Sequence, residues 1–147
     1  MKVEHPPLFA AGFHDISEAD ITRFFVEPFG EKERRVKLAG GLVQLLGKLK
    51  ELAPKFEVWL DGSFATHKPE PEDVDVAVFY DINEVNALDN EEKKSLEVLA
   101  THVDTKVRYN CDIYFIPNHD PSMRSYWRGW FGFARGEVPK GIPRLFV

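Results

Sequence analysis

The sequence predicts an α/β protein of the α+β type, with a small mixed sheet and helices packed on one face. Three observations support this fold class. One long segment has apolar residues at helical spacing, and three short segments have the apolar character of β-strands. A second helical pattern lies between the last two strand patterns, as expected where helices and strands build one core. No repeat, low-complexity tract or flexible linker interrupts residues 1–147, so we expect a single domain.

Size and composition fit a globular protein. The chain has 147 residues, of which 44% are hydrophobic and 29% are charged, so it can bury a substantial core. Its net charge of -5 argues against broad binding to a phosphate backbone, which needs clustered cations. The apolar stretches are far shorter than the ~20 residues of a membrane span, and the N-terminus lacks the apolar region of a signal peptide. We therefore expect a soluble, cytoplasmic protein without membrane contact.

The N-terminal third is expected to hold an extended segment and two helices. Residues 1–13 look extended, because they show no helical pattern. Asp15 and Glu18 have the spacing of a capping box, which predicts a short helix that ends near Phe25. The most regular helical pattern covers Glu31–Ala53, where Lys and Glu lie opposite an apolar face. We expect that face to pack on the sheet.

Apolar and alternating segments predict three strands. They cover Phe56–Leu60, Val74–Tyr80 and about Lys106–Ile116. Between the second and third strands, Asp89 is expected to cap a helix from about Glu91 to His102. The remaining C-terminal segment is rich in aromatic residues and has no pattern that assigns its structure.

Two aspartates on the second strand have an unusual position. Asp73 and Asp75 project from the same face, because side chains alternate along a strand. Adjacent like charges repel in a dry environment, and either solvent or a bound cation relieves this repulsion. Asp112 on the third strand joins the pair if the two strands are neighbours. Three carboxylates at one edge of a sheet can hold two Mg²⁺ ions roughly 3.5–4 Å apart, together with the phosphates of a substrate, with Mn²⁺ as the alternative metal.

A glycine–serine turn after the first strand is suited to phosphate binding. Gly62 allows a close approach of the backbone, and a strand-to-helix turn presents free N–H groups to an anion. Ser63 adds a hydroxyl group. Lys68 in the following loop is a candidate cationic contact, although a loop lysine is ordinarily solvated.

Gly62 and Ser63, followed by Asp73 and Asp75, resemble the Gly-Ser…Asp-x-Asp signature of the polymerase-beta-like nucleotidyltransferase superfamily. In that superfamily the Gly-Ser turn binds the triphosphate, the two aspartates bind metal, and a later strand supplies a third carboxylate. The resemblance implies a minimal nucleotidyltransferase core, in which Asp112 completes a metal-binding and catalytic triad with Asp73 and Asp75. It also implies that Gly62 and Ser63 bind the nucleotide.

The resemblance covers about Glu57–Ile116, and one feature departs from it. Minimal nucleotidyltransferases usually carry arginine in the loop after Gly-Ser, where this chain has Phe64, Thr66 and His67. Lys68 is the candidate replacement for the missing charge. Over nearly its whole length the chain is also similar to small bacterial and phage proteins built on this core. That similarity implies a toxin–antitoxin or phage-defence setting.

The implied reaction is Mg²⁺-dependent transfer of a nucleoside monophosphate from a nucleoside triphosphate (NTP) to an acceptor hydroxyl, with Asp112 nearest the acceptor oxygen. The acceptor stays open between a protein, an RNA and a small molecule. Because the flanks of the core are short, acceptor binding is expected to involve a partner chain, the groove of a homodimer, or a small acceptor. The alternative is a catalytically silent, antitoxin-like protein that acts through a partner interface. Nucleic-acid binding alone is a third interpretation, and the acidic net charge counts against it.

Four further features have a structural explanation. We expect Arg34 and Arg35 to be solvated at a helix start. Asp61 is expected to form a turn before glycine, with a role as an extra metal ligand as the alternative. The aromatic cluster Trp127–Phe133 is expected to close a core or a subunit contact, with base stacking as the alternative. Cys111 is the lone cysteine and is expected to be a small buried residue.

Overall fold

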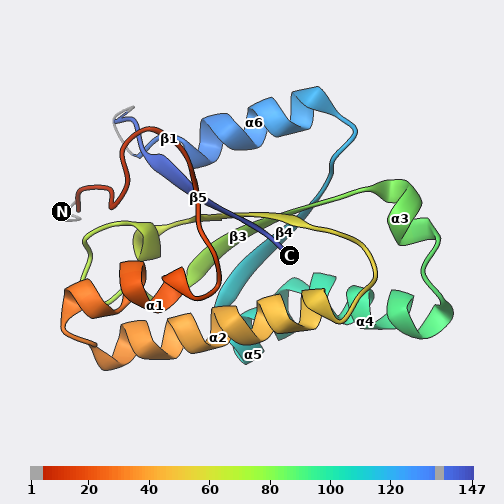
Figure 1. Ribbon diagram of the computed structural model, residues 1–147, viewed down its shortest axis with the longest axis horizontal. Coiled ribbons are helices and arrows are strands. Elements are labelled where there is room, and N and C mark those ends of the chain that lie inside the picture. Colours follow the sequence, from red (N-terminus) through yellow and green to blue (C-terminus); the bar gives the residue numbers. More distant parts are fainter. Residues whose placement is uncertain (1–4, 135–137) are drawn as a thin grey trace.

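The computed structural model describes residues 5–134 and 138–147 (Figure 1). The strands are β1 (Gly12–Asp15), β2 (Glu57–Asp61), β3 (Val74–Tyr80), β4 (Cys111–Pro117) and β5 (Gly141–Phe146). The α-helices are α1 (Asp20–Phe25), α2 (Glu33–Lys50), α3 (Ile82–Asn86), α4 (Asn90–Ala100), α5 (His102–Tyr109) and α6 (Pro121–Phe131), and the 3₁₀ helices are η1 (Glu27–Phe29) and η2 (Ser63–Ala65).

The five strands form one mixed sheet in the order β1-β5-β2-β3-β4. β2 is antiparallel to both of its neighbours, whereas β3 pairs with β4, and β1 with β5, in parallel. The predicted α+β class with a mixed sheet is therefore confirmed. Among the described residues, no helix combines the length and the apolarity that crossing a membrane would require.

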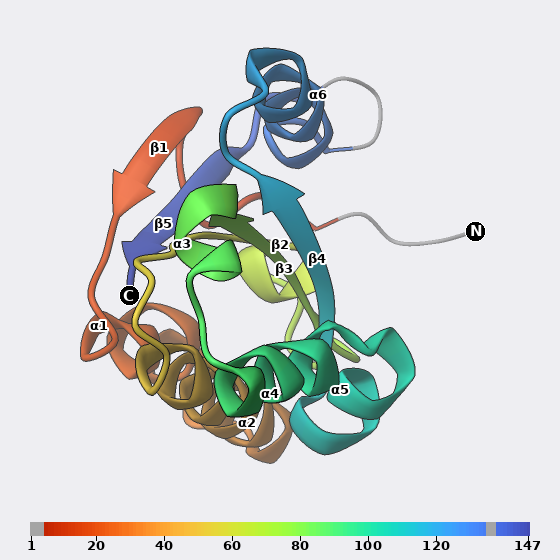
Figure 2. The same cartoon turned by 90° about the vertical axis from the view of Figure 1, so that its right-hand side faces the viewer.

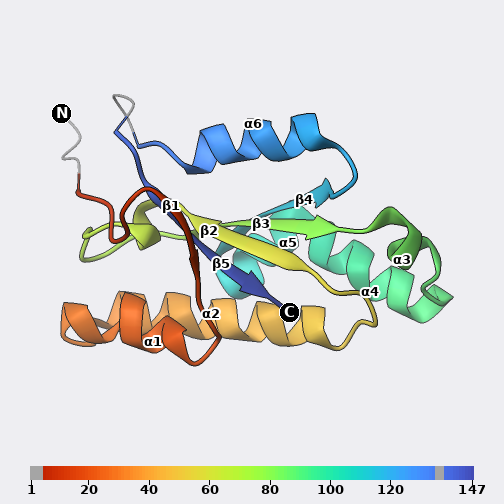
Figure 3. The same ribbon diagram turned by 45° about the horizontal axis from the view of Figure 1, so that its top comes forward.

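Helices cover both faces of the sheet, but unequally. Figures 2 and 3 show α1, α2, α4 and α5 on one face and α6 alone on the other. The prediction placed helices on one face only, because it assigned no structure to the C-terminal segment that contains α6. This helix begins where Asp120 accepts hydrogen bonds from the backbone N–H groups of Ser122 and Met123, with Pro121 in the first turn.

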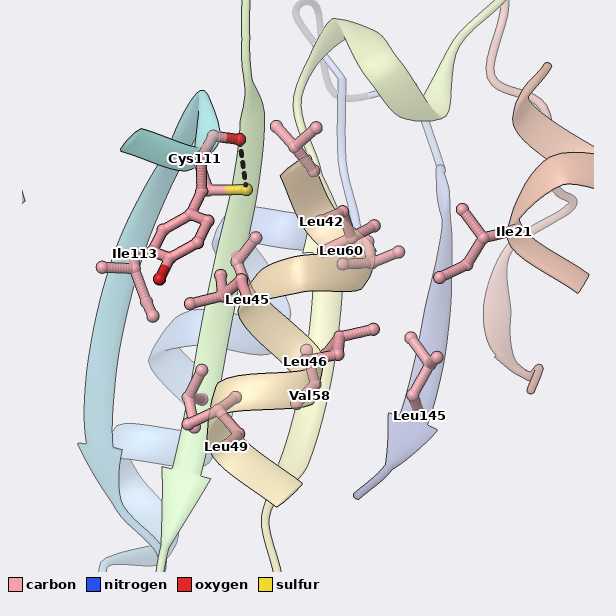
Figure 4. Packing of buried hydrophobic residues seen from close by; sticks show 14 of the residues in the cluster. Ile21, Leu42, Leu45, Leu46, Leu49, Val58, Leu60, Cys111, Ile113 and Leu145 are labelled. Atoms are coloured by element: carbon pink, nitrogen blue, oxygen red, sulfur yellow. Dashed lines mark hydrogen bonds between the residues drawn. The ribbon is translucent and has the colours of Figure 1, made fainter. Parts of the chain in front are cut away.

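The larger core lies between α2 and the sheet. Leu42, Leu45 and Leu49 of α2 are fully buried and face Val58 and other strand residues (Figure 4). Each such side chain stabilises the fold by roughly 1.5–3 kcal/mol relative to an exposed position. The prediction that the apolar face of this helix packs on the sheet is confirmed.

The close contact between α2 and α5 fixes where β4 begins. A Cβ atom on Gly41 would overlap the carbonyl oxygen of Tyr109, the last residue of α5. Asn110 then adopts a left-handed conformation with φ 58°, which ends the helix, and β4 starts at the next residue. The position where β4 starts goes together with its register against β3, in which Asp112 pairs with Asp75.

The third predicted strand begins too early. Residues 106–109 belong to α5, so only the part of the predicted strand from Cys111 onward is a strand. Polar and apolar residues alternate from Lys106 to Ile113, which mimics a half-buried strand. In the structure Val107 is 80% exposed, whereas Tyr109 is buried, as expected for a helix that packs along one stripe.

Of the two predicted helix caps, one is confirmed and the other is wrong. Asp89 caps α4 as predicted, since its side chain accepts a hydrogen bond of 2.8 Å from the backbone N–H of Glu92. The capping box predicted at Asp15 and Glu18 does not form. Instead, Asp15 ends β1, and Ser17 donates from its backbone N–H and its hydroxyl to Asp20 at the start of α1. Of the segment predicted to be extended, residues 1–4 lie outside the described part of the chain.

Candidate metal and nucleotide site

Asp61, Asp75 and Asp112 form a row across the sheet, at the end where β2 stops and β3 and β4 begin. We call these three residues the acidic row. Asp61 of β2 lies opposite Asp75 of β3 in the antiparallel ladder. Asp75 in turn lies beside Asp112 in the parallel ladder of β3 and β4. Strand register therefore brings together carboxylates from three separate segments of the chain.

The three carboxylates predicted as metal ligands lie within reach of one cation. Asp73, just before β3, joins Asp75 and Asp112, and one carboxylate oxygen from each lies within 4.8 Å of the others. All three side chains are half-buried, so they face a surface that solvent can enter. Oxygen ligands in this arrangement suit a hard divalent cation such as Mg²⁺.

Burial and electrostatic repulsion raise the pKa of two of these carboxyl groups. Burial, followed by the negative charges of Asp61, Asp73 and Asp112, raises the pKa of Asp75 to about 7. Burial and then the neighbouring Asp112 also raise the pKa of Asp73. A divalent cation would offset the repulsion and displace the protons. The donor set therefore fits the predicted metal.

Two basic side chains of α5 lie over the cluster. The Lys106 ammonium is 3.5 Å from Asp73 Oδ2 and 3.4 Å from Asp112 Oδ1, and so bridges two of the carboxylates. Nε2 of His102 lies 3.0 Å from the same Asp112 oxygen. The sequence pattern indicated neither contact, because Lys106 was expected in a strand and His102 at the end of the preceding helix. A helical assignment would have placed these two residues, four apart, on one face.

The predicted nucleotide-binding turn lies directly beside Asp75. Gly62 has φ 81° and ψ -171°, a backbone conformation that residues other than glycine rarely adopt. A Cβ atom there would lie 2.8 Å from Asp75 Oδ2. Glycine is therefore required both by the backbone and by the nearby carboxylate, and Ser63 begins η2 immediately afterwards.

A buried ion pair borders the turn on its other side. Nζ of Lys140, just before β5, lies 2.5 Å from Asp61 Oδ1 and donates a hydrogen bond of 3.1 Å to the Gly62 carbonyl. Burial raises the pKa of Asp61, and the Lys140 charge opposes this rise. The interpretation of Asp61 as a turn-forming residue is wrong, because it is the last residue of β2 and is ion-paired. Lys140 was missed because no sequence pattern connected it with the Gly-Ser turn.

An open cleft of about 940 Å³ connects these features. Its lining includes Asp61, Gly62, Ser63, Lys68, Asp75 and Lys140. The structure thus places all three residues predicted to bind the nucleotide along one cleft, together with one of the predicted metal ligands. A volume of this size is typical of a site for a small-molecule ligand.

Arg35 holds the loop that follows the turn. Its guanidinium donates hydrogen bonds to the carbonyl oxygens of Phe64, Thr66 and Lys68, and to that of Phe25 in α1. The side chain is fully buried, and burial lowers the pKa of Arg35 to about 10. The prediction of a solvated arginine pair is therefore wrong for Arg35. Carbonyl acceptors inside the fold leave no signal in the sequence.

Some aromatic side chains near the C-terminus pack in the core, and others line the cleft. Trp127 and Phe131 pack with Trp59 and Phe79 on the second face of the sheet, as predicted. By contrast, Trp130 is 66% exposed and lines the cleft. The packing prediction therefore applies to part of the segment only.

Cys111 is completely buried beneath the acidic row. Burial, followed by the charges of Asp112, Asp73 and Asp75, raises the pKa of its thiol to about 12. The thiol donates a weak hydrogen bond to the Tyr109 carbonyl, shown dashed in Figure 4. A buried neutral thiol is a packing group, in agreement with the sequence prediction.

The fold and the acidic edge of its sheet define an α+β protein in which three carboxylates meet beside an open cleft. The family model DUF6932, described as a family of unknown function, matches residues 1–145, so the chain belongs to this family. No curated protein and no solved structure matches the chain.

Proposed function

We propose that this protein is an Mg²⁺-dependent nucleotidyltransferase, which transfers a nucleoside monophosphate from an NTP to an acceptor hydroxyl and releases pyrophosphate. The observation that carries the proposal is the approach of Asp73, Asp75 and Asp112 to within 4.8 Å, beside a cleft lined by Gly62 and Ser63. Carboxylates that can hold a metal, next to a glycine–serine turn, suit metal-assisted phosphoryl transfer.

Each carboxylate has a role that follows from its place. Asp73 and Asp75 would hold the metal, which when bound neutralises charge on the phosphates. Asp75 is nearest the Gly62 turn, so it lies on the side where the phosphates would enter. Asp112 would assist the loss of the proton from the acceptor hydroxyl, because it lies farther from that turn, on edge strand β4.

The acceptor is the open part of this proposal. Protein, RNA and small-molecule acceptors remain alternatives, and the toxin–antitoxin or phage-defence setting stays a prediction from resemblance. The open side of the cluster bears the His102 and Lys106 side chains, and an acceptor that approaches Asp112 would meet them.

Calorimetric titration tests the proposal. ATP, GTP, CTP and UTP are titrated with Mg²⁺ into the wild type, into Asp73→Asn/Asp75→Asn, and into Glu91→Gln/Glu97→Gln. The last variant removes the same number of charges from exposed positions of α4 and is the matched control. We expect metal-dependent binding of at least one NTP that the aspartate variant loses and the control retains. Absence of binding by the wild type, or equal binding by the aspartate variant, contradicts the proposal.

One observation favours the second candidate, a catalytically silent protein that acts through a partner interface. The Lys106 ammonium contacts two of the three carboxylates, so the cluster already has a cation supplied by the chain. A silent protein would keep its biological effect in Asp73→Asn/Asp75→Asn, whereas an enzyme would lose it.

A further inference from the structure

The cleft beside the acidic row has two chemically different ends. One end is polar and is formed by the turn after β2 together with Lys140. The other end is aromatic and is formed by the last turn of α6, where Gly129 and Trp130 line the cleft. A ligand that fills the whole cleft would therefore combine an anionic part with a flat apolar part.

Lys140 is equipped to bind an anion at the polar end. It is only 5% exposed, yet it borders the cleft, so its ammonium is held in place rather than mobile in solvent. An ammonium group has three N–H donors. Within the described residues two partners are found, Asp61 and the Gly62 carbonyl, which leaves one donor for a ligand. Lys140 thus offers a second cationic contact in the cleft, besides Lys68 in the loop after Ser63.

Trp130 is equipped to stack on a planar group at the aromatic end. The neighbouring Trp127 and Phe131 are packed against the sheet, so α6 is held rigidly while Trp130 stays 66% exposed. Across 5–134 and 138–147, no other aromatic ring stacks on Trp130, although Trp127 contacts three rings. Trp130 therefore has exposed indole surface and lines the cleft.

We propose, building on the nucleotidyl transfer suggested above, that the cleft binds its NTP at both ends, with the phosphate chain at Lys140 and Ser63 and the nucleobase stacked on Trp130. Every nucleobase has a flat aromatic face, and stacking on a side chain of this kind strengthens binding without requiring a particular base. The acidic row lies beside the phosphate end, which places the metal ligands next to the reacting phosphates.

A double comparison of ligands and variants tests this arrangement. The two ligands are the NTP that the wild type binds best and inorganic tripolyphosphate, each with Mg²⁺. Trp130→Leu removes the stacking surface. Its matched control is Tyr126→Leu, since Tyr126 is 63% exposed on the same helix but does not line the cleft. Lys140→Met combined with Asp61→Asn removes the cation without leaving a buried unpaired carboxylate.

We expect Trp130→Leu to weaken NTP binding by between about fivefold and 150-fold, the range that corresponds to one stacked base, and to leave tripolyphosphate binding unchanged. Tyr126→Leu should change neither affinity. The Lys140→Met/Asp61→Asn variant should weaken the binding of both ligands. Thermal unfolding of each variant identifies a loss of binding that comes from unfolding.

Two results would overturn this arrangement. If Trp130→Leu binds the NTP as the wild type does, the base lies elsewhere. If Trp130→Leu weakens both ligands equally, Trp130 shapes the cleft and does not stack on a base. Either result leaves the proposed transferase intact, because the wild type still binds an NTP. Failure of the wild type to bind any of the four NTPs overturns both proposals.

Discussion

Asp75 lies directly opposite Asp61 across the antiparallel ladder of β2 and β3, so two carboxylates face each other where most sheets would place a neutral or oppositely charged pair. Lys140 neutralises Asp61 from the side of β5. In residues 5–134 and 138–147 no basic side chain forms an ion pair with Asp75, and its pKa of about 7 reflects its burial and the surrounding carboxylates.

The raised pKa of Asp75 predicts a loss of stability with rising pH. The folded state holds a proton on Asp75 more tightly than the unfolded chain does. The resulting stabilisation is complete below about pH 4 and is lost as the pH rises through about 7. We expect the free energy of unfolding of the metal-free wild type to fall over this window, and to fall much less in Asp75→Asn.

Urea denaturation at several pH values, with a chelator present, measures this difference. The effect of Asp75 on the free energy of unfolding should be on the order of a few kcal/mol across the window. Asp104→Asn, an exposed substitution on α5, should keep the pH dependence of the wild type. Identical slopes for the wild type and Asp75→Asn would contradict the assignment. Saturating Mg²⁺ should reduce the loss at high pH, because the metal binds the ionised form.

Gly62→Ala should damage both the fold and the cleft. The substitution places a side chain at φ 81° and sets its Cβ 2.8 Å from Asp75 Oδ2. We expect a destabilisation of roughly 1–3 kcal/mol from the backbone conformation, together with weaker metal-dependent NTP binding. Thermal unfolding and calorimetry measure the two effects.

A second glycine provides the control for this substitution. Gly47 lies in α2, and a Cβ there would meet nothing within 4 Å. Gly47→Ala should therefore be neutral or stabilise the protein by about 0.4–1 kcal/mol, with unchanged binding. Equal effects of the two substitutions would show that Gly62 has no special role.

The sequence predicted the parts of the site that depend on local pattern. Asp73 and Asp75 are two residues apart at the start of the predicted second strand, so the alternation of side chains along a strand predicts a common face. In the structure Asp73 lies just before β3 and Asp75 within it. Asp112 could be placed only by assuming that β3 and β4 are neighbours, and the structure shows that they are. Its flanking apolar residues identified the correct strand, although the start of that strand was placed within α5.

The missed contacts of Lys140 and Arg35 join segments that are distant in the chain. Lys140 reaches Gly62 across 78 positions, and Arg35 reaches Phe64 and Thr66 through backbone carbonyls, whose positions do not depend on residue type. The contacts of His102 and Lys106 with Asp112 were missed for other reasons. His102 was expected at the end of the preceding helix, and the segment from Lys106 to Ile113 alternates in polarity like a strand. Packing of α5 against α2 overrides that local pattern.

The bridging position of Lys106 predicts competition with a metal. Its ammonium contacts Asp73 and Asp112, so Mg²⁺ must displace it or share the carboxylates with it. Lys106→Met should therefore bind Mg²⁺ several-fold more tightly, and its melting temperature without metal should fall because the carboxylates lose a compensating charge. Lys94→Met, on the exposed side of α4, controls for the loss of one positive charge. Weaker Mg²⁺ binding by Lys106→Met would show that the lysine supports the metal site instead of competing for it.

Arg35 and Arg34 are neighbours in sequence, but substitution should destabilise the protein strongly at Arg35 and hardly at Arg34. Arg35 donates to four carbonyl groups and lies over the Phe29 ring at 3.6 Å, whereas Arg34 is exposed. Arg35→Met leaves these carbonyls without donors, at a cost of about 1–3 kcal/mol for each buried group that finds no water.

We therefore expect Arg35→Met to lower the free energy of unfolding by at least about 3 kcal/mol, and Arg34→Met to stay within about 0.5 kcal/mol of the wild type. Arg35→Lys should recover only part of the loss, because one ammonium cannot reach all the carbonyls that the planar guanidinium reaches. Chemical denaturation measures all three variants. If Arg35→Lys is as stable as the wild type, charge alone explains the role of Arg35. A partial recovery shows instead that the forked geometry of the guanidinium holds the loop beside the Gly62 turn.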